Sequence, residues 1–378
     1  MTDNSSGNRS KGSKRLFWTA FAFYALIAFE FFYMASPFAA YFYSVYGPGM
    51  DWLQALPVAD WTLWFFLPHL VEETKSSIIN AAEAVGLILF FGGLIAFLVG
   101  AFQVYRAKLT AQGAVTGGIY RYIRHPQYAA LIVASLGMLL VWPRFLVLFS
   151  TACVIFAYVL LARSEERVCL RNFSGYAAYM SSTGRFLPRL FQGQAAASQS
   201  SLRSSVVVAI GFFAGVVVAT GAAFGLRQLA IESLYTVETD AGVFLSVSKI
   251  DDGDLSSLAQ IALADEEVQE ALSKADAHNR LLAYVLPREM YVSEIPMVLP
   301  EGKSFGHSVP SNTDPNQWKV ILTRAQFGAG HRGKNVLSEA VNKSPLIEVH
   351  VDLSLNQITH RYDPPEVAFY NGRQVPIF

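Results

Sequence analysis

A group of basic and aromatic residues lies directly before an apolar segment in the first half of the chain. It reads GGIYRYIRHPQY over residues 117–128 and contains Arg124, His125 and Pro126. Pro126 suits the first position of a helix, where its missing N–H would have no partner, so His125 is expected near the N-cap. A helix N-terminus attracts anions, and the planar guanidinium of Arg124 matches a carboxylate or phosphate. The motif therefore predicts an anion-binding site at a helix start.

An acidic pair, Glu165 and Glu166, follows at the end of the next apolar stretch. The apolar segments 128–142 and 145–162 are separated by Pro143 and Arg144, which predicts a tight helical hairpin. We expect the pair to close the second helix, where carboxylates oppose the helix dipole and so indicate a role beyond solubility. Because the hairpin turns back, the basic motif and the acidic pair should converge at one membrane face. That polarity suits a zwitterionic ligand with a carboxylate and an ammonium group.

The elements that must position these groups are membrane-spanning helices. The chain has 378 residues, is 53% hydrophobic and only 15% charged, whereas soluble proteins average about 25% charged residues. The formal net charge is zero, which argues against a nucleic-acid binder. The apolar runs predict five spans, two of them the short arms of the hairpin. They cover residues 16–46, 78–105, 128–142, 145–162 and 206–226.

Glycines recur at helical spacing in two of these spans. Gly86, Gly93 and Gly100 fall on one face of the second span, and the fifth span holds Gly-xxx-Gly pairs at 211–215 and 221–225. Such stripes favour close helix contact.

The distribution of basic residues predicts the orientation. Lys11, Lys14 and Arg15, and the clusters at 106–124 and 163–203, fall on one side. That side is expected to be cytoplasmic. Five crossings then place the C-terminus outside, in what we expect to be a bacterial inner membrane. The tryptophan-rich loop 47–77 is expected to lie on the outer membrane surface.

Residues 232–378 read as a polar α+β domain on the extracytoplasmic side. Four β-rich runs, including GVFLSVSKI and LIEVHVDL, accompany one expected helix at Leu255–Ala275. Five of the seven histidines lie here, among them His350 beside Asp352 on one expected strand face. Their spacing matches no zinc pattern, so we expect no metal site. The fold class is thus mainly α: a polytopic transmembrane helix bundle plus a C-terminal extracytoplasmic α+β domain.

The two motifs together resemble a known family. Arg124-His125-Pro126 with its flanking tyrosines, then Glu165-Glu166, and RFLP at 185–188 are similar to the isoprenylcysteine carboxyl methyltransferase and phospholipid methyltransferase superfamily. The resemblance covers about residues 85–190. It implies that S-adenosylmethionine binds at the cytoplasmic face and that a lipophilic acceptor enters from the bilayer.

The resemblance also implies roles for individual residues. Glu166 and Arg185 would be catalytic, Glu166 as the base for an amine acceptor, and Arg185 either near the acceptor or closing the site. The cofactor would be bound by Tyr120, Arg124, His125, Pro126, Tyr128, Glu165 and Glu166. The sequence departs from the family at Ala130, where a glycine is common, and in the shortened element Phe173-Ser-Gly-Tyr176.

The sequence thus predicts an integral membrane S-adenosylmethionine-dependent methyltransferase acting on a lipophilic carboxylate or amine at the cytoplasmic interface. The predicted divisions are a disordered leader (1–15), a transmembrane methyltransferase-like domain (16–203), a fifth helix (204–231) and the outer domain (232–378). The alternative is a catalytically idle scaffold that anchors the outer domain in a membrane complex. Its protein partner would bind through residues 232–378 or the glycine-rich helix face at 211–225. A transporter is less favoured because the chain lacks paired inverted halves.

Overall fold

The computed structural model describes residues 48–56, 58–109, 115–189, 205–274, 280–303, 306–327 and 335–365. The predicted leader and the predicted span at 16–46 lie outside the described residues. Nothing in the structure therefore bears on those two predictions.

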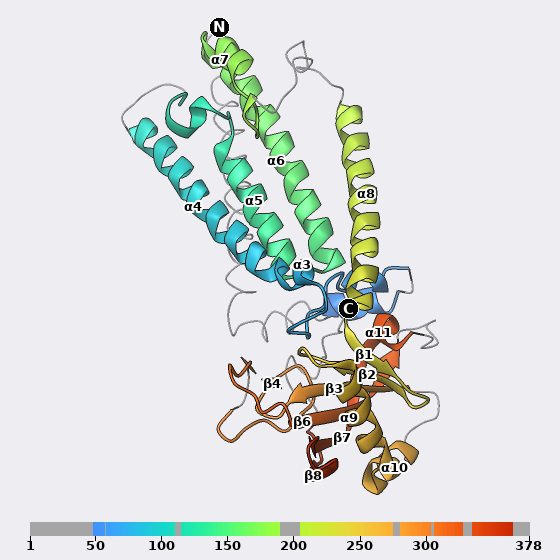
Figure 1. Cartoon of the computed structure of the whole chain (residues 1–378). Coiled ribbons are helices and arrows are strands. Elements are labelled where there is room, and N and C mark those ends of the chain that lie inside the picture. The colour runs from blue at the N-terminus through green and yellow to red at the C-terminus, as the bar shows by residue number, and fades with distance from the viewer. Residues whose placement is uncertain are drawn as a thin grey trace.

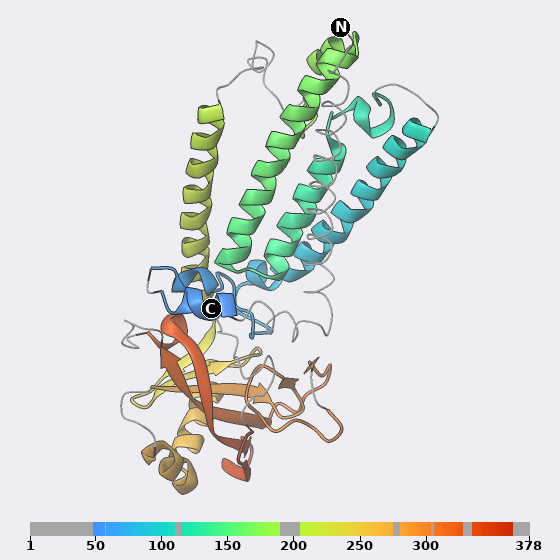
Figure 2. The same ribbon diagram turned by 180° about the vertical axis from the view of Figure 1, so that it is seen from behind.

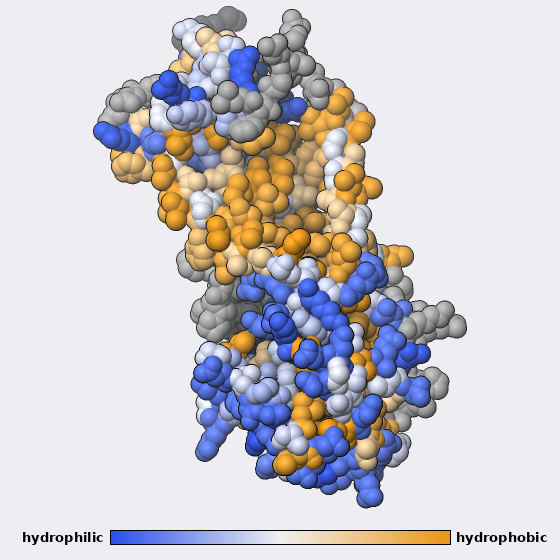
Figure 3. Space-filling model, viewed as in Figure 1, coloured by the Kyte–Doolittle hydropathy of each residue, from blue (hydrophilic) through white to orange (hydrophobic). Residues whose placement is uncertain are grey.

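Four apolar helices run side by side in the first part of the described chain (Figures 1 and 2). They are α4 (Ala82–Leu109), α5 (Pro126–Val141), α6 (Phe145–Asn172) and α8 (Ser205–Glu232). Three segments of the described residues are long and apolar enough to cross a membrane, and α5 is a shorter apolar helix. Figure 3 shows an apolar band over these helices and a largely polar surface below it. Such a band indicates an integral membrane protein.

The glycine stripe of α4 packs against α5 as the sequence predicts. A Cβ added at Gly93 would lie 2.6 Å from the carbonyl oxygen of Ala130, and one at Gly137 of α5 would lie 2.4 Å from the amide nitrogen of Phe90. Only glycine permits this backbone approach. On α8, by contrast, an added Cβ at Gly211, Gly215, Gly221 or Gly225 would meet nothing within 4 Å among the described residues.

The hairpin forms as predicted, but its second helix is longer than expected. Pro126 occupies the first turn of α5 with His125 as N-cap, and α6 begins at Phe145 after the Pro143–Arg144 turn. The predicted helix end at Glu165 and Glu166 is wrong, because α6 continues to Asn172. Glu165 and Glu166 therefore lie inside the helix, where ion pairs and hydrogen bonds to neighbouring segments hold them, and do not close it.

All strands of the main sheet follow α8. The order is β1-β2-β3-β6-β7-β8, with β2 and β3 parallel and every other neighbouring pair antiparallel. The six strands are β1 (Tyr235–Glu238), β2 (Gly242–Ser246), β3 (Leu281–Pro287), β6 (Gln317–Phe327), β7 (Ala340–Asp352) and β8 (Gln357–Tyr362). The parallel β2–β3 pair requires a crossover, which α9 and α10 provide.

The single helix predicted at Leu255–Ala275 is wrong, since two helices lie there. They are α9 (Asp252–Ala264) and α10 (Glu266–Ser273), separated by Asp265. The Asp265 side chain accepts a hydrogen bond from the Val268 amide and so caps the second helix, which favours a new helix start over continuation. Their apolar faces bury Leu255, Leu258 and Val268 against one face of the sheet.

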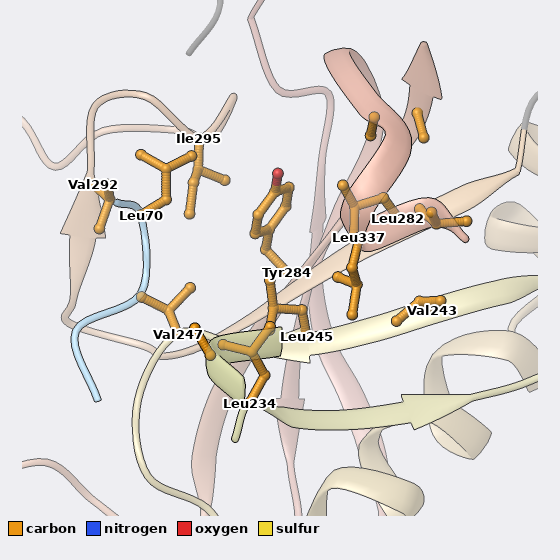
Figure 4. Close-up of a cluster of buried hydrophobic side chains, with 14 of the residues drawn as sticks. Leu70, Leu234, Val243, Leu245, Val247, Leu282, Tyr284, Val292, Ile295 and Leu337 are labelled. Carbon is orange, nitrogen blue, oxygen red and sulfur yellow. The ribbon is translucent and has the colours of Figure 1, made fainter. Parts of the chain in front are cut away.

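The other face of the sheet packs against the helix bundle. One core contains Phe66, Leu67 and Leu70 of the connecting loop, Phe145 of α6, and sheet residues such as Tyr284. Figure 4 shows Leu70 beside Val292 and Ile295. The loop is also tied by its backbone, because the amide of Glu72 donates to the carbonyl of Val247 at 2.8 Å. The bundle and the sheet therefore share a core.

The tryptophan-rich loop packs between the helix bundle and the sheet, and its predicted place at a membrane surface stays a prediction. Trp61 and Trp64 pack against the shared core, and the guanidinium of Arg227 lies 4.6 Å from the Trp64 ring centroid. Trp52 remains 64% exposed. Short elements complete the described chain: η1 (Asp60–Leu63), α3 (Ser77–Asn80), η2 (Gly118–Arg121), α7 (Tyr176–Ser182), β4 (Tyr291–Val292), β5 (His307–Ser308) and α11 (Val336–Glu339).

Candidate active site

A cavity of about 380 Å³ lies at the end of the bundle where α5 begins and α6 ends. This end carries η2 and α7 and faces away from the sheet (Figure 1). The cavity is lined by Val104, Ala107, Val115, Tyr120, Arg124, His125, Gln127, Tyr128, Glu165, Cys169, Phe173, Tyr176 and Tyr179. The basic motif and one member of the acidic pair thus meet on a single cavity wall.

A returning segment beyond α7 fixes the motif before it enters α5. The amide of Arg124 donates to the carbonyl of Gly184 at 2.9 Å, and that of His125 donates to the carbonyl of Arg185 at 3.1 Å. The Tyr179 hydroxyl donates to the Tyr120 carbonyl at 2.6 Å. These bonds bring Arg185 beside the hairpin, although it lies some sixty residues from the motif in the sequence.

Glu166 lies between two guanidinium groups. Arg124 Nε donates to Glu166 Oε1 at 2.9 Å, and Arg185 Nε donates to the same oxygen at 3.1 Å. A second bond joins Arg185 Nη2 to Glu166 Oε2. The Glu166 side chain is only 5% exposed. Both of its oxygens are therefore engaged in a buried, charge-assisted network.

The guanidinium of Arg124 forms its hydrogen bonds with other groups of the protein. In addition to Glu166, its Nη1 donates to the carbonyls of Met180 and Thr183. Its guanidinium therefore ties α5, α6 and α7 together, which differs from the prediction that its planar fork is available for a ligand anion. Arg124 still borders the cavity.

Glu165 has a different environment from its neighbour. It lines the cavity, and its side chain is 50% exposed. Tyr128 Oη donates to Glu165 Oε1 at 2.5 Å, and His125 Nδ1 lies 3.4 Å from Oε2. Glu165 is thus oriented by two motif residues and remains open on its cavity side.

His125 is stacked and has a carboxylate near each ring nitrogen. Its ring lies 5.5 Å from Tyr128 at an interplanar angle of 6°, and Tyr128 in turn stacks on Tyr158 at 5.0 Å. His125 Nε2 lies 3.4 Å from Glu166 Oε1. Burial by itself lowers the pKa of the His125 imidazole, but the contacts with Glu165 and Glu166 outweigh it and raise the pKa above its ordinary value. This arrangement favours the imidazolium.

The predicted site residues separate into two groups. Tyr120, Arg124, His125, Tyr128 and Glu165 line the cavity. Pro126, Glu166 and Arg185 are not among the described residues that line it. The structure thus brings all eight residues together but places both predicted catalytic residues, Glu166 and Arg185, in one ion pair.

Several lining residues were not predicted from the sequence. Val104 and Ala107 come from α4, and Cys169 lies one helical turn beyond the acidic pair. The first two are ordinary apolar residues of a span, and nothing in their type marks them. Cys169 shares a helix face with Glu165 at a spacing of four, a signal that could have been used.

The helices that form this cavity also match a known protein family. Residues 81–175 match the phospholipid methyltransferase family. The resemblance found in the sequence is confirmed by this match, which runs from the start of α4 to the beginning of α7 and includes the basic motif and the acidic pair. The family that these residues resemble consists of membrane methyltransferases.

The match has a definite limit. It ends before Tyr176, Tyr179 and Arg185, and it does not reach the sheet. No curated protein and no solved structure gave a significant match to the chain. The sheet region therefore has no counterpart in these comparisons, in agreement with the sequence reading.

Proposed function

We propose that the protein is an S-adenosylmethionine-dependent methyltransferase that acts on a lipophilic acceptor at the cytoplasmic membrane interface. The observation that carries this proposal is the cavity at the start of α5, with Glu165 oriented by Tyr128 and His125 on its wall. The family match over the same helices supports it. Membrane methyltransferases of this family act on lipophilic substrates.

The chemistry of the wall fits the cofactor. S-adenosylmethionine supplies an activated methyl group on a sulfonium, together with an amino-acid carboxylate and ammonium. A protonated His125 offers a cation to the carboxylate, and Glu165 offers an anion to the ammonium. Tyr120, Tyr176 and Tyr179 provide aromatic faces suited to a sulfonium cation. The cavity volume of about 380 Å³ falls within the usual range of about 300–1,000 Å³ for small-molecule sites.

The remaining residues suit a lipophilic acceptor. Val104 and Ala107 belong to α4, a candidate span, and contribute an apolar wall next to the polar one. In the transfer, the acceptor oxygen or nitrogen forms the new bond to the methyl carbon while the carbon–sulfur bond breaks. The bonding pair stays on sulfur. A carboxylate acceptor needs only alignment and exclusion of water.

An amine acceptor would also lose a proton. Glu166, the base predicted from the sequence, is held by Arg124 and Arg185 and does not border the cavity, and Glu165 is already assigned to the cofactor's ammonium. Glu166 and Arg185 are then positioning residues. They fix the motif segment and the α6 end so that His125 and Glu165 face the same space.

Transfer of a radiolabelled methyl group tests this function. The purified protein, reconstituted with membrane lipids, should move label from S-adenosylmethionine into lipid-extractable product. Glu165→Gln should reduce the rate by at least about tenfold, the scale of one charge-assisted hydrogen bond. Glu238→Gln, at an exposed position in β1, is the matched control. Equal labelling by wild type and Glu165→Gln would reject the assigned role.

The scaffold alternative requires no cofactor. It draws on the core that the bundle and sheet share, but the family match does not favour it. Its distinguishing result is a folded protein that neither binds S-adenosylmethionine nor transfers label.

The proposed orientation has its own test. The candidate site and the sheet lie at opposite ends of the bundle (Figure 2), and the proposal puts the site in the cytoplasm. Single cysteines introduced at Ser182 and Ser308, in a background lacking Cys153 and Cys169, should label from opposite sides with an impermeant reagent. Labelling of both from one side would contradict the topology.

A further inference from the structure

Three basic side chains form a row across one face of the sheet. Lys319 of β6 pairs with His350 of β7, which pairs with His360 of β8. Directly opposed residues of neighbouring strands project their side chains to the same face. The next row contains Glu348 and Tyr362, which also pair with each other. A compact group of titratable side chains therefore occupies this part of the sheet.

Lys319 is a buried cation with no direct counter-ion among the described residues. The residue is only 3% exposed. Burial lowers the pKa of its ammonium group, and Glu348 and Glu289 act from a distance to raise it. Within the described ranges no carboxylate oxygen lies within 4.0 Å of its Nζ. A buried charge of this kind is stabilised by an anionic partner.

Glu348 cannot supply that partner because its two oxygens are already engaged. Oε2 accepts a hydrogen bond from the amide of Val298 at 2.7 Å, and Oε1 is bonded to His350 Nε2 at 2.9 Å. Glu348 is 1% exposed. Its role is to fix the imidazole of His350, as carboxylates orient histidines in binding sites.

The other ring nitrogen of His350 has no hydrogen-bond partner among the residues that the structure describes. Nδ1 is buried and makes no hydrogen bond within the described part of the chain. Buried polar atoms normally have a partner. Next to it stand the rings of Tyr362, at 4.8 Å, and His360, at 6.0 Å. His360 is exposed, so the row begins at a buried ammonium and ends at the solvent.

We propose that this row, Lys319, His350 and His360, is a binding site for the phosphate or carboxylate group of a small soluble molecule. Lys319 Nζ and His350 Nδ1 are the inner groups of this site, and His360 is the outer one. A metal ion is not indicated, since the described residues contain no group of three suitable ligands.

The position of the row favours a soluble ligand over a lipid headgroup. β7 starts at α11 beside the helix bundle and ends near β8 at the far end of the sheet (Figure 1). His350 is two residues from the last residue of β7, and β8 forms the edge of the sheet. The row shares the sheet face that carries Tyr284 and Ile321 of the shared core, but it lies toward the end of β7 away from α11 and the apolar band.

Calorimetric titration of the full-length protein with inorganic phosphate, and separately with acetate, tests the site. The protein is held in nanodiscs of phosphatidylcholine, so that no anionic lipid competes. We expect one saturable site for at least one of the two probes. Lys319→Met and His360→Gln should each weaken it by about tenfold or more, the effect of losing one charge-assisted hydrogen bond. Lys274→Met, on the exposed surface of α10, should leave it unchanged.

Three results would overturn the proposal. The first is no saturable binding of either probe to the wild type. The second is native anion affinity in both His360→Gln and a folded Lys319→Met. His360 is exposed, so its substitution is not expected to disturb folding. The third is loss of phosphate binding when phosphatidylglycerol is added to the nanodiscs, which would assign the row to lipid headgroups.

Discussion

The two ends of the α5–α6 hairpin both place a basic residue among aromatic rings, yet they differ in what those residues do. At the closed end, Arg144 lies 4.6 Å from the Phe65 ring centroid and Phe65 stacks on His69 at 4.8 Å. At the open end, Arg124 and His125 adjoin Tyr128 and a cavity. The closed end contacts the sheet, and the open end faces away from it.

The electrostatics follow this difference. At the closed end burial lowers the pKa of His69 to about 4, with Glu294 opposing the effect and Arg144 adding to it. Burial likewise lowers the pKa of Lys343 to about 7. Burial in the packed junction thus favours the neutral form of His69 and weakens the protonated form of Lys343. At the open end the pKa of His125 is raised. A basic residue near a helix end is thus a candidate ligand-binding residue only where it keeps its charge and borders a cavity.

The largest expected effect comes from Glu166. Glu166→Gln should lower the free energy of unfolding by about 3–5 kcal/mol, the cost of breaking a buried ion pair from one side, because Arg124 and Arg185 lose their carboxylate. Denaturant unfolding in detergent measures it, with Glu238→Gln as control. Unchanged stability would contradict the structural role given to Glu166 and return it to the catalytic candidates.

A smaller effect is expected at the closed end. Arg227 Nε donates to the carbonyl of Phe65 at 3.1 Å, and Nη2 donates to that of Ser338 at 2.7 Å. Arg227→Met should destabilise the junction by about 1.5–3 kcal/mol and expose the sheet to protease, while S-adenosylmethionine affinity stays native. If Arg227→Met also loses cofactor affinity, the two ends of the hairpin are coupled, and the separate roles given to them are wrong.

Tyr128→Phe should act only at the open end. It removes the 2.5 Å hydrogen bond to Glu165 Oε1 but retains the ring that stacks on His125 and Tyr158. We expect cofactor affinity to fall by about 1.5 kcal/mol, roughly tenfold, with little change in unfolding. The control is Tyr362→Phe in the sheet. Native affinity in Tyr128→Phe would show that the orientation of Glu165 is unimportant.

The smallest expected effect is a pH dependence due to His125. Because its folded pKa is raised, its stabilising contribution is fully present below the unfolded value of about 6.5 and is lost as pH rises through the folded pKa. Thermal unfolding of wild type and His125→Gln across this range measures it. The wild-type advantage should shrink as pH increases. An advantage that grows with pH would reverse the inferred sign.

The sequence predicted the hairpin and the convergence of its two motifs correctly. The reason is local: Pro126 sets a helix start, and Pro143-Arg144 sets a turn between two apolar segments. The sequence could not distinguish Glu165 from Glu166. Adjacent helical residues point about 100° apart, and which one faces the cavity depends on Arg185, brought in by the distant Ile123–Gly184 bridge. The sequence also could not predict that Trp61 packs against the core, because that position depends on the distant sheet.

The central claim is that the open end binds S-adenosylmethionine with Glu165 on the cavity wall. Calorimetric titration of the purified full-length protein with S-adenosylmethionine tests it most directly, with Glu165→Gln and Glu238→Gln measured in the same detergent. We expect one saturable site in the wild type and in Glu238→Gln, and affinity weakened by at least about tenfold in Glu165→Gln. A folded wild-type protein that takes up no cofactor, or equal affinity in all three proteins, would contradict it.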